Sequence, residues 1–155
     1  MIDGVRIVPL RQLRDERGAI FHMLRADDPA FEGFGEIYFS FVRPGWVKGW
    51  HLHRAMTLNY AVPVGRVRLV LYDDRDGSPT RGAVQEIEMG EDQYVRVRVP
   101  AGVWNGFRGE SESDAMVANC ATLPHEPNEI VRIAPDDPRV PYKWPRDEID
   151  QVRGG

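Results

Sequence analysis

The sequence predicts an all-β fold of the barrel or sandwich class. Short runs rich in β-branched and aromatic residues follow one another at close spacing, and turns rich in glycine and proline separate them. No part of the chain alternates strands with long amphipathic helices. With 155 residues, the chain is long enough for one domain with a substantial core and short for two. We therefore expect a single domain over residues 1–155.

The apolar runs place the expected strands. These are Val5–Leu10, Ala19–Leu24, Glu36–Val42, Val47–His53, Leu58–Pro63, Val67–Tyr72, Val84–Met89, Tyr94–Val99, Val103–Phe107, Ala115–Ala121 and Ile130–Ile133. A charged turn is expected at Arg14–Gly18, and an irregular loop with at most one helical turn at Asp27–Gly35. The proline-rich tail should stay irregular apart from its one strand, and only Arg146–Val152 has the pattern of a short helix.

Charge and hydropathy exclude several classes of partner. The net charge is −4 and no basic stripe is present, so nucleic acid is not an expected partner. No apolar run reaches the roughly 20 residues of a membrane span, and charge comes too early at the N-terminus for a signal peptide. The single cysteine, Cys120, lies in an apolar run and is expected in the core. The sequence thus favours a cytoplasmic protein without a membrane partner.

The segment Gly45–Gly65 carries the strongest chemical signal. His51 and His53 lie one residue apart in an expected strand, so their side chains should share a face. Lys48 precedes them, and Gly49 leaves room for close approach of another backbone. A face with two imidazoles and an ammonium group is suited to binding an anion or to moving a proton.

The spacing of these residues resembles the first motif of the cupin jelly roll, and Pro100-Ala-Gly-Val-Trp-Asn105 resembles the second. In metal-binding cupins the two motifs supply two histidines, a glutamate and a third histidine. Here Leu58 stands at the glutamate position and Asn105 at the last histidine position. Leucine offers no lone pair and a neutral amide is a poor ligand for a transition metal. We therefore expect no metal and no other cofactor.

Five motifs in order resemble the dTDP-4-dehydrorhamnose 3,5-epimerases. They are DERG at Asp15–Gly18, PGWVKGWHLH at Pro44–His53, LYDDRDGSPTRG at Leu71–Gly82, VPAGVWNGF at Val99–Phe107 and VPYKWP at Val140–Pro145. The resemblance implies a cupin jelly roll (a double-stranded β-helix with few short helices) that forms a homodimer. It also implies a metal-independent epimerase of a nucleotide-diphospho-4-keto-6-deoxy sugar, serving deoxysugar or polysaccharide biosynthesis.

The resemblance assigns roles to individual residues. His51 matches the base of the family, and the acid tyrosine of the family falls on Ala118. Tyr60 is the expected substitute acid, because it shares strand parity with Leu58, whose counterpart in metal cupins points into the barrel. In the family a C-terminal segment supplies an aspartate to the base histidine, and we expect no counterpart of it within residues 1–155. The expected substrate-binding residues are Arg17 and Lys48 (both for the diphosphate), His53, Asn105, His125 and Tyr142.

Other functions remain open at this point. The His51-x-His53 pair is also seen in nucleotide-sugar 3,4-ketoisomerases, which act on the same class of substrate. The absence of the family's acid tyrosine is compatible with a non-catalytic protein that binds a sugar nucleotide. A metal-dependent dioxygenase is disfavoured by Leu58 and Asn105.

Overall fold

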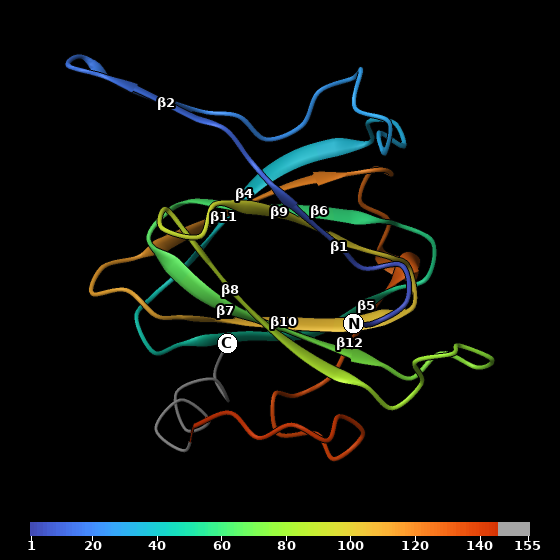
Figure 1. The fold of residues 1–155 in the computed structure, drawn as a ribbon. Coiled ribbons are helices and arrows are strands. Elements are labelled where there is room, and N and C mark those ends of the chain that lie inside the picture. The colour runs from blue at the N-terminus through green and yellow to red at the C-terminus, as the bar shows by residue number, and fades with distance from the viewer. Residues whose placement is uncertain (146–155) are drawn as a thin grey trace.

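The computed structural model of the protein describes residues 1–145, and it is built almost entirely from antiparallel strands in two facing sheets (Figure 1). The first sheet holds five strands in the order β1 (Arg6–Pro9), β9 (Val95–Val99), β6 (Leu58–Val64), β11 (Ala115–Ala121) and β4 (Glu36–Val42). The second has the order β12 (Ile130–Arg132), β5 (Val47–His53), β10 (Val103–Gly109), β7 (Arg66–Asp73) and β8 (Val84–Gly90). The expected jelly roll is confirmed.

The main core fills the space between the sheets. Inward-facing side chains from both sheets form one buried cluster that includes Leu58, Leu69, Val97 and Phe107. Successive side chains of a strand point to opposite faces of the sheet. About half of the side chains in each strand therefore face this core layer.

At one point β5 and β10 approach unusually closely. A Cβ atom added to Gly49 would lie 3.1 Å from the Cα atom of Gly106, so neither position has room for a larger residue.

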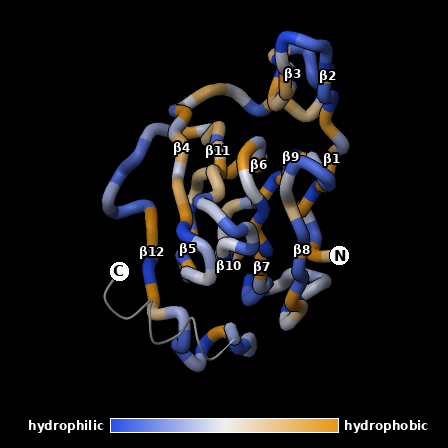
Figure 2. Tube along the Cα trace, turned by 90° about the vertical axis from the view of Figure 1, so that its left-hand side faces the viewer, coloured by the Kyte–Doolittle hydropathy of each residue, from blue (hydrophilic) through white to orange (hydrophobic). Residues whose placement is uncertain are grey.

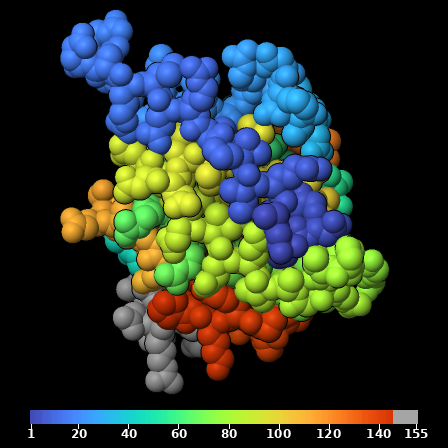
Figure 3. Space-filling view, viewed as in Figure 1, coloured from blue at the N-terminus to red at the C-terminus, as the bar shows by residue number. Residues whose placement is uncertain are grey.

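A second apolar cluster covers the outer face of the second sheet. Trp50 is fully buried there, and the centroid of its ring lies 5.2 Å from that of Trp144 in the tail. The Trp50 indole N–H donates to the carbonyl oxygen of Pro135 at 3.0 Å. The tail, drawn in red in Figures 1 and 3, runs beneath this sheet as an irregular segment after the short 3-10 helix η1 (Pro127–Glu129) and β12. Trp50, which directly precedes His51, is thereby held in place.

A third, two-stranded sheet stands clear of the body. The hairpin of β2 (Gln12–Asp15) and β3 (Gly18–Phe21) projects at the upper left of Figures 1 and 3. Leu13 and Ile20 on it are exposed. The edge strand β4 is coloured mostly as hydrophobic in Figure 2, and its Ile37 and Phe39 are likewise about half exposed. The hairpin and the edge of the first sheet therefore present apolar surface to solvent.

All eleven expected strands are present, with small shifts in their bounds. β3 ends at Phe21 and not at Leu24, and the expected charged turn is shorter than predicted because β2 extends through Asp15. The loop at Asp27–Gly35 contains turns and no helix. The expected helix at Arg146–Val152 lies outside the described residues. Within residues 1–145, no helix has the length and apolarity needed to cross a membrane.

Candidate active site

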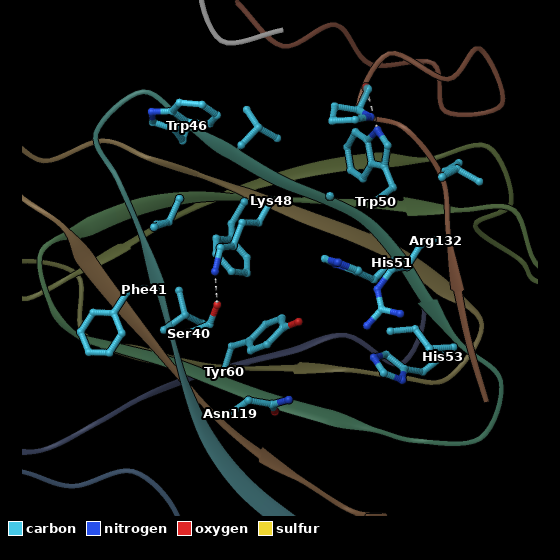
Figure 4. A pocket seen from close by; sticks show the side chains of 18 of the residues that line it. Ser40, Phe41, Trp46, Lys48, Trp50, His51, His53, Tyr60, Asn119 and Arg132 are labelled. Carbon is cyan, nitrogen blue, oxygen red and sulfur yellow. Dashed lines mark hydrogen bonds between the residues drawn. The ribbon is translucent and has the colours of Figure 1, made fainter. Parts of the chain in front are cut away.

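A cavity of about 810 Å³ opens between the two sheets, lined by β4, β6 and β11 on one side and by β5, β12 and the tail on the other (Figure 4). Its lining is apolar for the most part. The charged, imidazole, hydroxyl and amide side chains in it are Tyr38, Ser40, Arg43, Lys48, His51, His53, Tyr60, Asn119 and Arg132. Of the residues predicted from sequence, the cavity brings together Lys48, His51, His53 and Tyr60.

An irregularity in β5 gives the cavity its cationic wall. Asn105 of β10 is opposite His51 and Phe107 is opposite Lys48, so two steps along β10 match three along β5. This β-bulge resets the alternation of faces. Lys48, His51 and His53 consequently all line the cavity, while Trp50 between them packs into the outer cluster. The predicted shared face of His51 and His53 is confirmed.

His51 is poised as a neutral imidazole. Burial lowers its pKa to about 4, and the positive charges of Arg132, His53 and Lys48 act in the same direction. Arg132 is directly opposite His51 in the pairing of β12 with β5. No hydrogen bond or ion pair of the Arg132 side chain occurs within residues 1–145, so its charge is available to a ligand in the cavity. Figure 4 shows its guanidinium close to His51.

The low pKa of His51 has a consequence for stability. The imidazole binds a proton near pH 6.5 in the unfolded chain but only near pH 4 in the folded protein. Stability is therefore lost as the pH falls from about 6.5 to about 4, by about 3 kcal/mol at most. Chemical denaturation at pH 7 and at pH 4 should show a loss for the wild type that exceeds the loss for His51→Asn by roughly this amount. Equal losses in the two proteins would contradict the burial of a neutral His51.

His53 has a carboxylate partner that the sequence did not reveal. Its Nδ1 atom is 2.5 Å from Oε1 of Glu129, and both side chains are about nine-tenths buried. The other oxygen of Glu129 accepts from the backbone N–H groups of Ala55 and Met56, at 3.1 and 3.0 Å. Burial acts to raise the pKa of Glu129, but the hydrogen bonds outweigh it and the pKa lies below its ordinary value. An ionised Glu129 thus fixes the orientation of the His53 ring.

The hydroxyl of Tyr60 crosses the barrel from β6 to β10. It donates to Oδ1 of Asn105 at 2.8 Å, and the amide nitrogen of Asn105 donates to the backbone oxygen of His51 at 3.2 Å. Burial raises the pKa of Tyr60 well above its ordinary value. Asn105 itself is fully buried and does not line the cavity, so the structure places it behind His51 and not at the expected substrate surface.

The wall opposite His51 carries a row of polar residues across three neighbouring strands. Asn119 of β11 pairs with Tyr38 of β4 on one side and with Tyr60 of β6 on the other. The Asn119 amide nitrogen donates to the Tyr38 hydroxyl at 3.0 Å. At the next inward position of β4, the Ser40 hydroxyl accepts from the Lys48 ammonium at 2.9 Å and links the two walls (Figure 4).

Besides Asn105, three more of the expected substrate-binding residues lie outside this cavity. Arg17 is at the tip of the projecting hairpin, 84% exposed, and paired with Asp15 at 2.6 Å. His125 is exposed in the loop after β11. Tyr142 lies in the tail against the outer face of the second sheet, where its hydroxyl donates to Oε1 of Glu86 at 2.5 Å. Trp104 and Trp144 belong to the buried outer cluster.

The model of one protein family, described as dTDP-4-dehydrorhamnose 3,5-epimerase, matches residues 1–153. The chain belongs to this family. It is 32% identical over 142 residues to the spore coat polysaccharide biosynthesis protein SpsL of Bacillus subtilis, covering 92% of this chain and 91% of that protein. It is 33% identical over 143 residues to a probable low-salt glycan biosynthesis epimerase, Agl13, of Haloferax volcanii, covering 91% of this chain and 88% of that protein.

The fold also agrees with solved structures of the epimerase family. A dTDP sugar isomerase from Desulfovibrio desulfuricans superimposes with a TM-score of 0.91, at 44% identity and with 92% of each chain covered. A dTDP-6-deoxy-D-glucose-3,5-epimerase from Legionella pneumophila, described in complex with dTDP-4-keto-L-rhamnose, gives 0.82 at 26% identity, covering 93% of this chain and 80% of that one.

The departures from the epimerase pattern can now be placed. Ala118, at the position of the family's acid tyrosine, is buried, and it does not line the cavity. Leu58 is part of the main core. Within the described residues no three His, Cys, Asp or Glu side chains are grouped as a metal site would require. The sequence did not single out Tyr38, Asn119, Glu129 or Arg132, each of which lines the cavity or holds a residue that does.

Proposed function

We propose that this protein is a metal-independent epimerase of a nucleotide-diphospho-4-keto-6-deoxy sugar in deoxysugar or polysaccharide biosynthesis. The observation that carries the proposal is a neutral imidazole, His51, beside cationic groups in a cavity large enough for a hexose. Family membership and the names of the relatives support the substrate class.

The ketone at C4 makes the neighbouring C–H protons acidic, because the electrons left behind delocalise onto oxygen as an enolate. In the proposed step the free ring nitrogen of His51 takes such a proton, and the C–H electrons form a C=C bond as the carbonyl oxygen becomes negative. Arg132 and Lys48 line the same cavity as His51, and in the proposed step they stabilise this negative oxygen. Negative charge in the cavity also raises the basicity of His51, because it offsets the cations that lower its pKa.

The residues at the metal-ligand positions of other cupins support independence from metal. Leu58 has no donor atom and lies in the core. The oxygen of Asn105 already accepts from the Tyr60 hydroxyl and its nitrogen donates to a backbone carbonyl. Neither position offers a ligand to an ion held by His51 and His53, and two imidazoles alone bind such an ion weakly.

A second candidate is 3,4-ketoisomerisation of the same substrate class. It is favoured by the presence of both imidazoles on one wall, with the His53 ring oriented by Glu129. Such a pair could carry a proton between adjacent carbons, and the ketone would move from C4 to C3.

One NMR experiment separates these functions. The protein is incubated in deuterated water with dTDP-4-keto-6-deoxyglucose, and the product is identified by its coupling constants and label. Inversion with deuterium at C3, at C5 or at both is the expected result. A ketone at C3 would favour the isomerase, and an unlabelled, unchanged sugar that nonetheless binds would favour a non-catalytic binding protein.

We also propose that the protein is a homodimer in which the hairpin of one subunit reaches the other. Leu13 and Ile20 on the hairpin and Ile37 and Phe39 on β4 expose apolar surface, and the unpaired edge of β4 needs covering. Arg17 lies in the turn between β2 and β3 and does not line the cavity of its own chain, so its expected role toward the diphosphate requires the cavity of a partner.

Two measurements test this arrangement. Light scattering should give a mass near twice the 17.7 kDa of one chain. Arg17→Ala should weaken the binding of thymidine diphosphate by about ten- to a hundredfold in calorimetry, since a charge-assisted hydrogen bond contributes about 1.5–3 kcal/mol. Its folding should be nearly unchanged, because the lost ion pair with Asp15 is exposed and stabilises little. A monomer at micromolar concentration, or unchanged affinity, would contradict the arrangement.

A further inference from the structure

We propose that Tyr38 is the general acid that protonates the sugar on the side opposite His51. The inference rests on the proposed epimerase function and assigns the one catalytic role that the family resemblance leaves empty at Ala118. It depends on the position of Tyr38 in the cavity and on the hydrogen bonds that direct its hydroxyl.

Tyr38 and His51 occupy facing walls of the cavity. Tyr38 is on β4, in the first sheet, and His51 is on β5, in the second. Both side chains line the same cavity, and the two sheets face each other across it (Figure 1). An epimerase needs a base on one side of the sugar ring and an acid on the other. The two walls provide this separation.

The hydrogen bonds around Asn119 determine whether the Tyr38 hydroxyl donates or accepts. The Asn119 side-chain oxygen accepts from the backbone N–H of Asn59 at 3.1 Å. This contact fixes the orientation of the amide, so its nitrogen faces Tyr38 and donates to the phenol oxygen at 3.0 Å. The Tyr38 oxygen is therefore an acceptor, and its own proton finds no acceptor among residues 1–145. A donor aimed at the phenol oxygen also stabilises the phenolate that remains after proton transfer.

The hydroxyl of Tyr60, the acid expected from sequence, already donates to another residue of the protein. Its proton is donated to Asn105 at 2.8 Å, and its hydroxyl is deeply buried, which disfavours the phenolate. Tyr38 is 41% exposed, so solvent reaches this residue. Of the two tyrosine hydroxyls on this wall, only that of Tyr38 keeps a proton that no residue in 1–145 accepts.

The protons balance over one turnover. His51 removes a proton from the carbon beside the ketone, leaving the enolate. The enolate then restores the C=O bond as its carbon forms a new C–H bond on the opposite side with the proton from Tyr38. The products are the inverted sugar, an imidazolium on His51 and a phenolate on Tyr38. Water carries the proton from the imidazolium back to the phenolate, and no oxidant or reductant is needed.

The test compares two rates in deuterated water, inversion of the sugar and exchange of its proton without inversion. A protein that keeps the base but lacks the acid can still form the enolate and return a solvent deuteron from His51 to the same side. Tyr38→Phe should therefore lose inversion by about 10²–10⁴-fold and retain exchange with retained configuration. His51→Asn should lose both. Tyr72→Phe is the matched control, because Tyr72 lies in the outer cluster, and it should leave both rates unchanged.

The outcomes distinguish the inference from the function on which it rests. Inversion by Tyr38→Phe at the wild-type rate would overturn the inference and leave the epimerase intact. Selective loss of inversion in Tyr60→Phe in place of Tyr38→Phe would assign the acid to Tyr60. Loss of exchange together with loss of thymidine diphosphate binding in Tyr38→Phe would make Tyr38 a binding or structural residue. Absence of both reactions in the wild type would overturn the epimerase itself and the role of Tyr38 with it.

Discussion

Replacement of His51 by asparagine should slow epimerisation by about 10²–10⁴-fold, the usual loss when a positioned base is removed. Asparagine keeps the polar character of the site but cannot take a proton at neutral pH. Because His51 is neutral down to about pH 4, the wild-type enzyme already holds its base in the reactive form at pH 7. The measurement is the initial rate of deuterium incorporation from solvent, followed by NMR.

A control variant separates loss of the base from general damage. His22→Asn makes the same change after β3, outside the cavity, where the backbone carbonyl of His22 accepts from Tyr94 at 2.7 Å. It should keep the wild-type rate. If His51→Asn exchanged substrate protons as fast as the wild type, another group would be the base, and His53 with its carboxylate partner would be the first to examine.

Replacement of Arg132 by glutamine should lower kcat by about 10²–10³-fold, which is typical of losing one group that stabilises a developing oxyanion. The side chain has no carboxylate partner within the described residues, and it lines the cavity beside His51. Removing its charge also removes one cause of the low pKa of His51, which should move up toward its ordinary value. An NMR titration of the histidine ring protons follows this second effect.

The two readouts together are specific to a cation that acts inside the cavity. Arg139→Gln is the matched control, since Arg139 is engaged with Asp137 at 2.8 Å on the exposed tail. It should change neither kcat nor the titration of His51. An unchanged kcat in Arg132→Gln, with the His51 titration shifted, would show that Arg132 tunes the base without contacting the enolate oxygen.

The fold could be predicted from the sequence because the alternation of apolar and polar residues, and the residues that form turns, are local signals. The strands from Glu36 to Ala121 were expected within a residue or two of their bounds, since most of these runs of β-branched and aromatic residues end at, or directly before, a glycine, proline or aspartate. β2 was missed because its residues, QLRD, are mostly polar and exposed, and only pairing with β3 makes them a strand. The shared face of His51 and His53 followed from parity alone.

Only part of the site could be predicted from the sequence, because half of it depends on pairing between distant strands. The strand at Ile130–Ile133 was expected, but nothing local shows that it pairs with β5 and brings Arg132 beside His51 and Glu129 to His53. Tyr38 and Asn119 meet through the register of β4 with β11. Lys48 shares a wall with His51 only because of the β-bulge, which strict alternation would not allow.

The central claim is that His51 transfers a proton of the sugar in this cavity without a metal. The most direct test is the rate of deuterium incorporation into dTDP-4-keto-6-deoxyglucose after the enzyme has been dialysed against chelator and analysed for metal content. We expect label at C3 or C5 with inverted configuration, at a rate unchanged by chelator and lost in His51→Asn. Stoichiometric iron, zinc or manganese in the purified enzyme, with incorporation abolished by chelator and restored by the metal, would contradict it.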